Sequence, residues 1–263
     1  MVEEMKEFSS LTCQKAGTRE HDRVQRARIL IVGLGGLGAP AALHLAAAGV
    51  GTLGLVEFDD VEISNLHRQI LYRTPDLGRP KVRVAAERLT ALYPGVSLKC
   101  FAERLSTQNV PKIFPEFDFI IDGTDRVASK YLVNDGAVLC GVPFSHAGIM
   151  GFQGQTMTVF PGQSACVRCL FPTPPPAGEV PTCQEAGIIG ALAGSIGLLQ
   201  AVEALKYLLG AGELLTDRLL IYDALATGWR TVRVSRNRRC PLCGDQPTIR
   251  QLVSADSADE PCG

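Results

Sequence analysis

Short apolar runs alternate with longer helix-like stretches between residue 28 and about residue 150. The apolar runs have the length of buried strands, and they cover residues 28–32, 52–58, 96–101, 117–121 and 142–146. The stretches typical of helices cover 36–48, 81–92 and 128–140, and the second of these repeats its apolar residues with a helical period. Strands that alternate with helices favour parallel βαβ units. The pattern therefore predicts an α/β fold with a doubly wound, mostly parallel sheet.

The pattern changes after residue 150. Residues 155–160 predict an additional strand, and the proline-rich segment after it predicts a mobile crossover loop at about 172–186, because proline is excluded from helix interiors and central strands. Residues 190–209 predict a long helix, and residues 218–223 and 229–234 predict two antiparallel strands. A cysteine-bearing tail follows the second strand. We therefore expect one domain over 28–244, an N-terminal segment over 1–27 and a disordered tail over 245–263.

Charge and apolar content narrow the classes of partner. The chain has 263 residues, with 26 lysines and arginines against 27 aspartates and glutamates. This balance argues against nucleic acid or an anionic membrane surface as the partner. The N-terminus lacks the apolar core of a secretory signal, and polar residues interrupt the most apolar stretch, 186–209, so we expect no membrane span. We expect a cytoplasmic protein, and in that reducing compartment close cysteine pairs hold metal more often than they form disulfides.

A glycine-rich sequence follows the first predicted strand and opens the first predicted helix. Gly33, Gly35, Gly36 and Gly38 fit the pattern G-x-G-x-x-G. In this pattern the first glycine makes a tight turn, the second lets a phosphate approach the backbone, and the last lets helix and strand pack closely. The context is that of a Rossmann-like nucleotide site. A glycine-rich turn without a nucleotide stays an alternative, and the pattern does not separate NAD from ATP.

Charged residues follow the second predicted strand. Glu57 and Asp59 stand where an acidic residue takes the ribose hydroxyls of a bound nucleotide. Arg68 can clamp phosphate oxygens bidentately, and Lys81 begins the next predicted helix. Positive charge at this place would stabilise the negative charge that develops during adenylyl transfer. The alternative is a solvated polar loop.

Four motifs occur in order along the chain, namely GLGGLG at 33–38, SNLHRQ at 64–69, GRPK at 78–81 and DGTD at 122–125. With them, the chain from about residue 25 to Gly244 resembles the E1-type activating enzymes, specifically the bacterial family that adenylates ubiquitin-like sulfur carrier proteins. The resemblance implies an ATP-binding domain that activates the C-terminal glycine of a small carrier ending in Gly-Gly, forms an acyl-adenylate and releases pyrophosphate. It also implies a homodimer and a persulfide protein as sulfur donor.

The resemblance implies roles for single residues as well. Asn65, Arg68 and Lys81 would handle the phosphates and the transition state, and Asp125 would hold a catalytic magnesium ion near the α-phosphate. The residues expected to contact the nucleotide are Gly33, Gly35, Gly36, Gly38, Glu57, Asp59, Ser64, Asn65, Leu66, His67, Arg68, Lys81, Asp125 and Arg126.

The sequence departs from the family pattern at two places. Glu57 stands where the family usually has a ribose-binding aspartate, which keeps the charge and lengthens the reach. The family usually opens with an R-Y-x-R-Q segment whose arginine reaches across the dimer to the partner's ATP, and here the corresponding stretch runs from Lys6 to Ser10. Lys6 or Arg19 could substitute, but a lysine does not reproduce a bidentate clamp.

Two C-x-x-C pairs supply four thiolates. Cys166 and Cys169 form the first pair, and Cys240 and Cys243 form the second. Two such pairs can close one tetrahedral zinc site, which would staple the tail to the body of the protein. Redox pairs or coincidence are the alternatives. The resemblance implies that the same four cysteines bind a structural zinc ion.

The remaining cysteines carry weaker signals. Cys183 lies between the proline-rich segment and the long predicted helix, where the helix N-terminus favours a thiolate. It is a candidate nucleophile for a covalent link with the carrier or with sulfur, and the equal alternative is a cysteine that adenylation does not need. The others, which show no partner pattern and are expected in the core or the tail, are Cys13, Cys100, Cys140 and Cys262.

The leading hypothesis is an ATP-dependent adenylyltransferase that acts on a sulfur carrier protein. Residues 185–187 and 221–224 look closer to the molybdopterin-synthase activating branch of the family than to the thiazole-forming branch. One alternative is a carrier-binding or heterodimerising scaffold without catalysis, motivated by the missing N-terminal arginine. A nicotinamide-dependent oxidoreductase is a remote alternative, because it explains neither the SNLHRQ motif nor the four paired cysteines.

Overall fold

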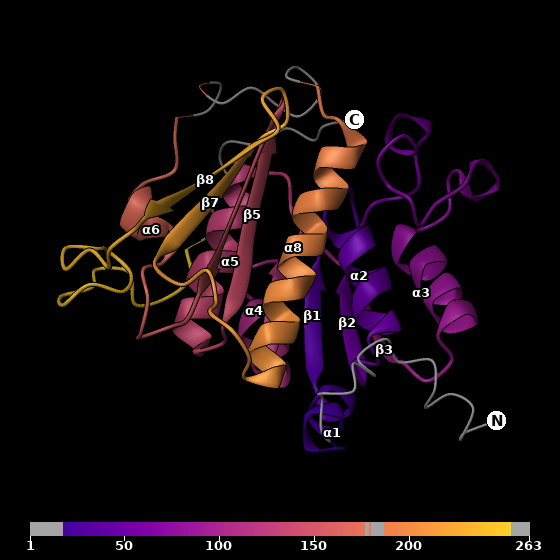
Figure 1. Cartoon of the computed structure of the whole chain (residues 1–263), viewed down its shortest axis with the longest axis horizontal. Coiled ribbons are helices and arrows are strands. Elements are labelled where there is room, and N and C mark those ends of the chain that lie inside the picture. Colours follow the sequence, from indigo (N-terminus) through magenta and orange to yellow (C-terminus); the bar gives the residue numbers. More distant parts are fainter. Residues whose placement is uncertain (1–17, 177–178, 180–186, 254–263) are drawn as a thin grey trace.

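An eight-stranded sheet forms the centre of the structure, a computed structural model that describes residues 18–176, 179 and 187–253 (Figure 1). The strand order is β3-β2-β1-β4-β5-β6-β7-β8. The strands are β1 (Arg28–Val32), β2 (Thr52–Val56), β3 (Ser97–Phe101), β4 (Phe119–Asp122), β5 (Phe144–Met150), β6 (Gln153–Val159), β7 (Arg218–Asp223) and β8 (Gly228–Arg233). Pairs among β1 to β5 are parallel, and β6, β7 and β8 are antiparallel to their neighbours. The predicted α/β fold with C-terminal antiparallel strands is therefore confirmed.

Helices cover both faces of the sheet (Figure 1). The helices are α1 (Thr18–Arg26), α2 (Gly38–Ala47), α3 (Lys81–Leu92), α4 (Val110–Ile113), α5 (Val127–Cys140), α6 (Val167–Leu170) and α8 (Gly190–Leu209), with short 3-10 turns at η2 (Ile63–Asn65), η3 (Thr74–Asp76) and η4 (Phe114–Glu116). Along β1, Ile29 and Ile31 pack with residues of α2, α3 and α8, whereas Leu30 and Val32 pack with residues of α4 and α5. A parallel strand that is buried on both faces needs such an unbroken apolar sequence.

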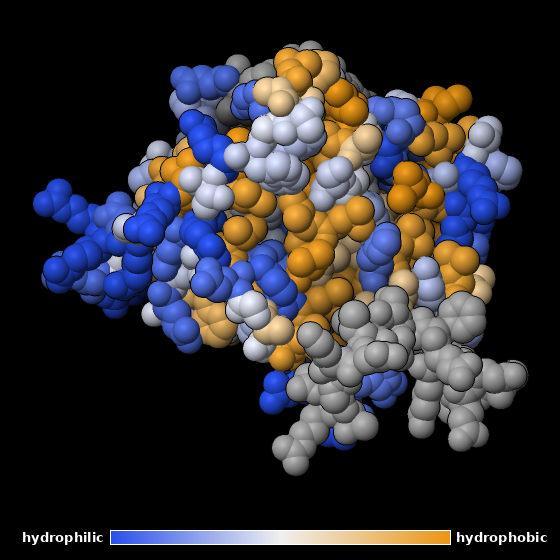
Figure 2. All heavy atoms as spheres, viewed as in Figure 1, coloured by the Kyte–Doolittle hydropathy of each residue, from blue (hydrophilic) through white to orange (hydrophobic). Residues whose placement is uncertain are grey.

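Helix α8 crosses the sheet beside α2 (Figure 1). Among the described residues it is the one helix long and apolar enough to cross a membrane, and 44% of its most apolar window is buried inside the structure. It packs against α2, β4, β5 and β6. On the face shown in Figure 2, apolar side chains gather over α8, and hydrophilic side chains gather over the segment that follows β8. The apolar residues of α8 thus supply core packing on one side and an apolar surface on the other.

Most predicted elements are observed within two residues of their predicted ends. Strand β2 stops at Val56, earlier than predicted, because the next backbone N–H groups turn back to the Glu57 carboxylate. Strand β5 extends beyond its predicted end to Met150, because it pairs with the antiparallel strand β6 along its whole length. Helix α1 was not predicted, and it occupies the last part of the predicted N-terminal segment.

The C-terminal segment differs from its prediction. The backbone N–H groups of Thr248 and Ile249 both donate to the carbonyl oxygen of Pro241, at 2.9 and 2.8 Å. Ile249 and Leu252 also pack against the core cluster on the α5 face of the sheet. The prediction of a disordered tail is therefore wrong for residues 245–253, because tertiary packing orders them. The predicted crossover loop at about 172–186 lies largely outside the described residues.

The contact between α8 and α2 predicts unequal effects for two glycines of α8. A Cβ atom on Gly197 would lie 2.2 Å from the carbonyl oxygen of Leu37, whereas a Cβ atom on Gly194 meets no described atom within 4 Å. We expect Gly197→Ala to lower the free energy of unfolding by about 1–3 kcal/mol through overpacking. Gly194→Ala should leave it unchanged or raise it by up to about 1 kcal/mol through helix propensity. Urea denaturation measures both values, and equal values would contradict this packing.

Candidate functional site

A cavity of about 220 Å³ lies at the carboxyl ends of β1, β2 and β4. The strand order reverses between β1 and β4, which is where open α/β sheets bind ligands. Most of the lining comes from three segments, namely the β1–α2 turn, the segment that runs from the end of β2 through η2 to Gln69, and the β4–α5 turn. The predicted site residues found in the lining are Gly33, Gly35, Gly36, Glu57, Asp59, Ser64, Asn65, Arg68, Lys81, Asp125 and Arg126.

Three of the predicted nucleotide contacts are not among the described cavity-lining residues, namely Gly38, Leu66 and His67, and their contact with a nucleotide stays a prediction. A Cβ atom on Gly38 would lie 1.9 Å from the carbonyl oxygen of Gly33, so Gly38 serves the close packing of α2 against the preceding turn. Leu66 packs against the core cluster under α2 and α3. His67 follows η2 and is exposed, and its Nε2 lies 2.9 Å from Nη1 of the lining residue Arg68. The candidate nucleophile Cys183 lies outside the described residues.

The β1–α2 turn is shaped by glycine at the cavity. Gly33 has a φ of +85°, in the left-handed region that favours glycine. A Cβ atom on Gly33 would lie 2.9 Å from the carbonyl oxygen of Gly123 in the β4–α5 turn, so the two turns touch through backbone alone. Helix α2 begins directly after this turn, and its N-cap residue Leu37 makes no side-chain cap. Its N-terminal N–H groups and helix dipole therefore suit an anion.

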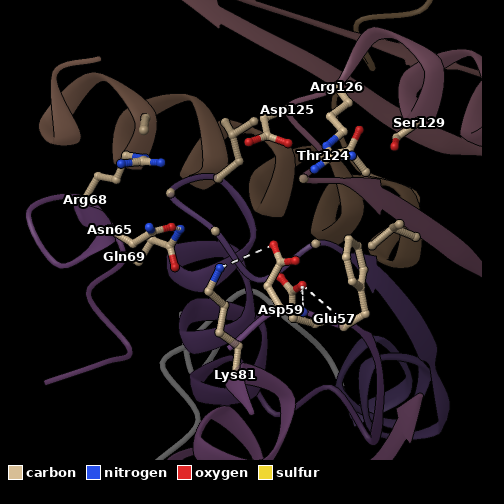
Figure 3. A pocket seen from close by; sticks show the side chains of 18 of the residues that line it. Glu57, Asp59, Asn65, Arg68, Gln69, Lys81, Thr124, Asp125, Arg126 and Ser129 are labelled. Carbon is tan, nitrogen blue, oxygen red and sulfur yellow. Dashed lines mark hydrogen bonds and ion pairs between the residues drawn. The ribbon is translucent and has the colours of Figure 1, made fainter. Parts of the chain in front are cut away.

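Glu57 fixes the end of β2 to this turn. Its Oε2 accepts a hydrogen bond from the N–H of Leu34 at 2.9 Å, and its Oε1 accepts from Phe58 and Asp59 at 2.9 and 3.1 Å. Burial raises the pKa of Glu57, against the opposing effect of the Lys81 ammonium. Lys81 is itself only 4% exposed and lies 3.5 Å from the Asp59 carboxylate (Figure 3). The end of β2 thus combines two carboxylates and one ammonium at the cavity wall.

The segment 64–69, which includes the end of η2, presents amide and guanidinium groups at the cavity. Asn65 donates through Nδ2 to the Ser64 hydroxyl at 2.7 Å and accepts from Gln69 at Oδ1. Nη1 of Arg68 donates to the carbonyl oxygen of Ser64 at 3.2 Å. Oε1 of Gln69 is buried without a hydrogen-bond partner in the described part of the chain. Figure 3 shows Arg68, Asn65 and Gln69 together on one side of the cavity.

Asp122 anchors the β4–α5 turn. Its buried carboxylate accepts hydrogen bonds from the N–H and the hydroxyl of Thr124, at 3.2 and 2.6 Å, and from Nδ1 of His146 at 2.9 Å. Burial acts to raise the pKa of Asp122, but the Lys130 ammonium at 3.5 Å and the hydrogen bond from His146 lower it to about 2. Burial also lowers the pKa of His146, and because an ionised carboxylate only accepts hydrogen bonds, Nδ1 of His146 is the donor in this contact. The anchored turn leaves Asp125 exposed at the cavity.

Sequence reasoning missed several polar residues of the lining, namely Glu62, Gln69, Arg104, Thr124, Ser129 and Lys130. Ser129 and Lys130 lie three and four residues after Arg126 on α5, so helical spacing from the DGTD motif could have found them. Arg104 comes from the loop after β3, and its guanidinium stacks over the Phe58 ring at 4.5 Å from the ring centroid. No local pattern marks Arg104, because only the tertiary structure brings that loop to the cavity.

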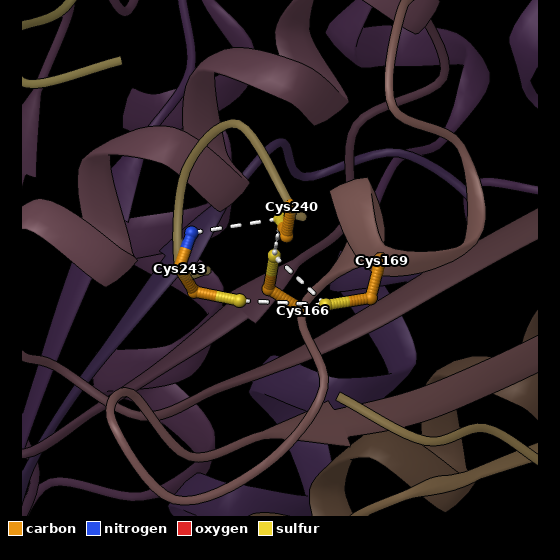
Figure 4. A group of neighbouring side chains, drawn as sticks. All are labelled: Cys166, Cys169, Cys240 and Cys243. Carbon is orange, nitrogen blue, oxygen red and sulfur yellow. Dashed lines mark hydrogen bonds between the residues drawn. The ribbon is translucent and has the colours of Figure 1, made fainter. Parts of the chain in front are cut away.

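The two C-x-x-C pairs meet on the α5 face of the sheet (Figure 4). Their four Sγ atoms lie within 4.8 Å of one another, as the spacing predicted. The shorter separations are 3.7 Å between Cys166 and Cys240 and 3.4 Å between Cys169 and Cys243. A tetrahedral zinc ion with bonds of about 2.3 Å needs sulfur atoms about 3.8 Å apart, so the donor set fits zinc. The N–H of Asn237 also donates to Sγ of Cys169 at 3.3 Å, a bond that orients a metal ligand.

Helix α5 connects this cysteine cluster to the cavity. The Arg168 side chain, within the first C-x-x-C pair, makes two hydrogen bonds of 2.7 Å to the carboxylate of Asp135. Asn134 accepts a hydrogen bond from the N–H of Val167 at 2.9 Å. Both acceptors lie on α5, whose N-cap residue is Arg126. The cysteine cluster and the cavity are therefore supported by the same helix.

The sequence profile of the ThiF family matches residues 9–242 of this chain. A sulfur carrier protein adenylyltransferase of Thermus thermophilus is 47% identical to it over 248 residues, which cover 92% of this chain and 92% of that protein. A probable adenylyltransferase/sulfurtransferase MoeZ of Mycobacterium tuberculosis is 41% identical over 248 residues. That match covers 92% of this chain and 63% of MoeZ, so this chain spans less than two thirds of the length of MoeZ.

Solved structures share the architecture at low sequence identity. E. coli MccB, in a crystal structure with MccA-N7isoASN, superposes with a TM-score of 0.78 and 21% identity. The superposition covers 86% of this chain and 69% of the MccB chain. PaaA superposes with a TM-score of 0.68 and 22% identity. At this identity the likeness concerns the fold alone.

The buried pair of Asp122 and His146 predicts a pH dependence of stability. Because the pKa of His146 lies lower in the folded than in the unfolded chain, the unfolded chain takes up the proton first as the pH falls below about 6.5. The free energy of unfolding should then decrease with falling pH. We expect His146→Gln to weaken this decrease between about pH 7 and pH 5, and His44→Gln, which alters an exposed histidine, to retain it. Urea denaturation at both pH values measures the decrease, and an unchanged decrease in His146→Gln would contradict the assignment.

Proposed function

This chain belongs to the ThiF family, and we propose that it transfers the AMP part of ATP to the C-terminal glycine of a small ubiquitin-like sulfur carrier protein. The observation that carries the proposal is the convergence of the glycine turn with Asn65, Arg68, Lys81 and Asp125 on one cavity where the strand order reverses. The Thermus thermophilus relative, named a sulfur carrier protein adenylyltransferase, supports it. The family resemblance carried by the four sequence motifs is confirmed.

The nucleotide would lie between the glycine turn and the end of β2. Gly35 and Gly36 have no side chains, so phosphate oxygens can approach the backbone N–H groups and the N-terminus of α2. Glu57 and Asp59 are acceptors for the ribose hydroxyls. Each oxygen of a carboxylate can accept about two hydrogen bonds, and Oε2 of Glu57 accepts one from the backbone. Glu57 can therefore hold the glycine turn and bind a hydroxyl at the same time.

The reaction joins a carboxylate oxygen of the carrier's terminal glycine to the α-phosphorus of ATP. The bond from the α-phosphorus to the oxygen that bridges to the β-phosphorus breaks, and pyrophosphate leaves with the electron pair. Negative charge spreads over phosphate oxygens in the transition state, so fixed cations stabilise it. Arg68 offers a fork of N–H donors, and Lys81 offers a compact charge that Asp59 holds in place.

We assign the magnesium ion to Asp125. Its carboxylate is exposed in the cavity lining, on a turn whose geometry the buried Asp122 fixes. A carboxylate combined with substrate phosphates is the usual environment of this ion in proteins. When bound, magnesium neutralises charge on the phosphate chain. Asp125 thereby belongs to the phosphate end of the site, with Arg68 and Asn65 on the other side of the cavity (Figure 3).

We assign zinc to Cys166, Cys169, Cys240 and Cys243. Four thiolates complete a tetrahedral coordination shell and leave no open position, so this ion would be structural. It would join the segment after β8 to the start of α6, and through Arg168 to helix α5. The zinc would therefore staple the C-terminal segment to the body of the protein.

The partner in this proposal is a carrier that ends in Gly-Gly. The sequence at 185–187 and 221–224 favours a molybdopterin-type carrier over a thiazole-type carrier. We further propose a cytoplasmic homodimer that uses the apolar surface of α8 as one contact (Figure 2), and a persulfide protein as sulfur donor. Cys183, which lies outside the described residues, stays a candidate for a covalent link with the carrier or with sulfur.

ATP–pyrophosphate exchange tests the adenylyl transfer. We expect exchange in the parent protein that depends on adding a purified Gly-Gly-ended carrier of the molybdopterin or thiazole type. Asp125→Asn should lower this exchange by about 100-fold or more, because it removes a fixed charge that acts where the transition state develops charge. The initial rate of radiolabelled pyrophosphate incorporation into ATP measures both.

Asp60→Asn is the matched control. Asp60 is exposed like Asp125 and lies close to Lys81 along the β2–α3 connection, but it is not among the described cavity-lining residues. Its exchange rate should equal that of the parent. Equal rates for Asp125→Asn and the parent would contradict the role of Asp125. No exchange in the parent with either carrier would overturn the proposed activity and favour a carrier-binding scaffold.

Metal analysis tests the zinc assignment. We expect about one zinc ion per chain in the purified protein, as a closed four-thiolate site holds. Cys240→Ser should lose most of the zinc and lower the melting temperature, because metal binding and folding are coupled. Cys100→Ser, which alters an exposed cysteine outside the cluster, should retain both. Full zinc content in Cys240→Ser would contradict the assignment.

A further inference from the structure

Lys130 reaches the cavity from the first turns of α5, but its ammonium group contacts the protein itself. The side chain is 15% exposed and belongs to the cavity lining. Its Nζ donates to the carbonyl oxygen of Thr124 at 2.6 Å and to the carbonyl oxygen of Ala147 on β5. It also lies 3.5 Å from the carboxylate of Asp122. One ammonium group therefore joins the β4–α5 turn to strand β5 and to the end of β4.

The hydrogen-bond donors of this ammonium group are all used within the protein. An ammonium group has three N–H donors and no acceptor. Two donors of Lys130 are taken by the carbonyl oxygens of Thr124 and Ala147, and the Asp122 carboxylate faces the third. No donor is left for a phosphate oxygen. Although Lys130 lines the cavity, it therefore acts on the protein backbone and not on a ligand.

Two contacts of Lys130 bracket Asp125 along the main chain. Nζ holds the carbonyl oxygen of Thr124, which belongs to the peptide group just before Asp125. The backbone N–H of Lys130 donates to the carbonyl oxygen of the residue just after it, Arg126, at 3.0 Å. Asp122 binds the N–H and the hydroxyl of Thr124 in addition. The main chain is thus fixed on both sides of Asp125, whose carboxylate is exposed in the cavity (Figure 3).

We propose that Lys130 is a positioning residue, which holds the β4–α5 turn in the conformation that presents the Asp125 carboxylate to magnesium. This inference rests on the proposed use of ATP and on the assignment of magnesium to Asp125. A group that orients a metal ligand without touching the metal changes metal affinity by about 10- to 100-fold when it is removed. Loss of Lys130 should therefore weaken the contribution of magnesium to ATP binding, and leave the binding of metal-free ATP as it is.

Nucleotide binding to the full chain tests this role without a carrier. Isothermal titration calorimetry measures the affinity for ATP with magnesium and with EDTA, and the parent should bind ATP more tightly with magnesium. We expect Lys130→Met, which removes the ammonium group, to lose about tenfold or more of this tightening. Its affinity for ATP in EDTA should equal that of the parent, because no phosphate contact is lost. Lys130→Arg, which keeps the charge beside Asp122, should lose less.

The double variant Lys130→Met/Asp125→Asn tests whether the effect passes through Asp125. It should lose no more of the tightening than Asp125→Asn alone, because two changes that act on one group are not additive. Additive losses would contradict this route. Lys112→Met is the matched control, since it removes the same charge from an exposed position on α4, and it should retain the full tightening.

The outcomes separate the role of Lys130 from the proposed function. Parent-like tightening in Lys130→Met, or in Lys130→Arg if Lys130→Met does not fold, would overturn the role of Lys130 while the proposed ATP site stands. A loss of affinity in EDTA as large as the loss with magnesium would also overturn it, since Lys130 would then bind phosphate or support the fold. A parent protein that binds ATP equally in both conditions would overturn the magnesium assignment, and one that binds no ATP would overturn the proposed function. This inference would fall with either.

Discussion

The cavity depends on one contact, in which the backbone of the β1–α2 turn lies directly against the backbone of the β4–α5 turn. A Cβ atom on Gly123 would come within 2.7 Å of the Gly33 carbonyl oxygen, and a Cβ atom on Gly38 within 1.9 Å of the same oxygen. No side chain fits between the two turns at this point. Because β1 and β4 are neighbours where the strand order reverses, their turns open toward one space. Residues 33–36 and 122–126, which are distant in the sequence, therefore form a single site.

Buried polar groups hold this contact in place. Glu57 binds the β1–α2 turn through the N–H of Leu34, and Asp122 binds the β4–α5 turn through Thr124. Gln200 of α8 donates to the backbone carbonyl oxygen of Asp122 and to that of Ser145 in the neighbouring strand β5. Both carboxylates thus hold backbone in place, and of the two only Glu57 is among the described cavity-lining residues. The positively charged side chains at the cavity can therefore bind the negatively charged phosphates of a nucleotide.

Helix α5 joins the two candidate sites of the protein. Its N-cap residue Arg126 lies at the cavity, and two turns later Asn134 and Asp135 hold the segment that carries the first C-x-x-C pair. A bidentate contact such as that between Arg168 and Asp135 fixes orientation as well as distance. A metal bound by the four cysteines would therefore support the helix that presents the β4–α5 side of the cavity. A metal held by all four cysteines would have no open coordination position for chemistry, and helix α5 would connect it to the cavity.

Local signals in the sequence determined the elements, the glycine turn, most of the cavity residues and the meeting of the cysteine pairs. The apolar run of β1, the helical period of α3 and the C-x-x-C spacings are each properties of a few consecutive residues, so a sequence shows them. The sequence did not show that Leu66 packs against the core, that Arg104 reaches the cavity, or that residues 245–253 pack on the body. These features were decided by the tertiary structure, because they depend on contacts between segments that strand pairing brings together from distant parts of the chain.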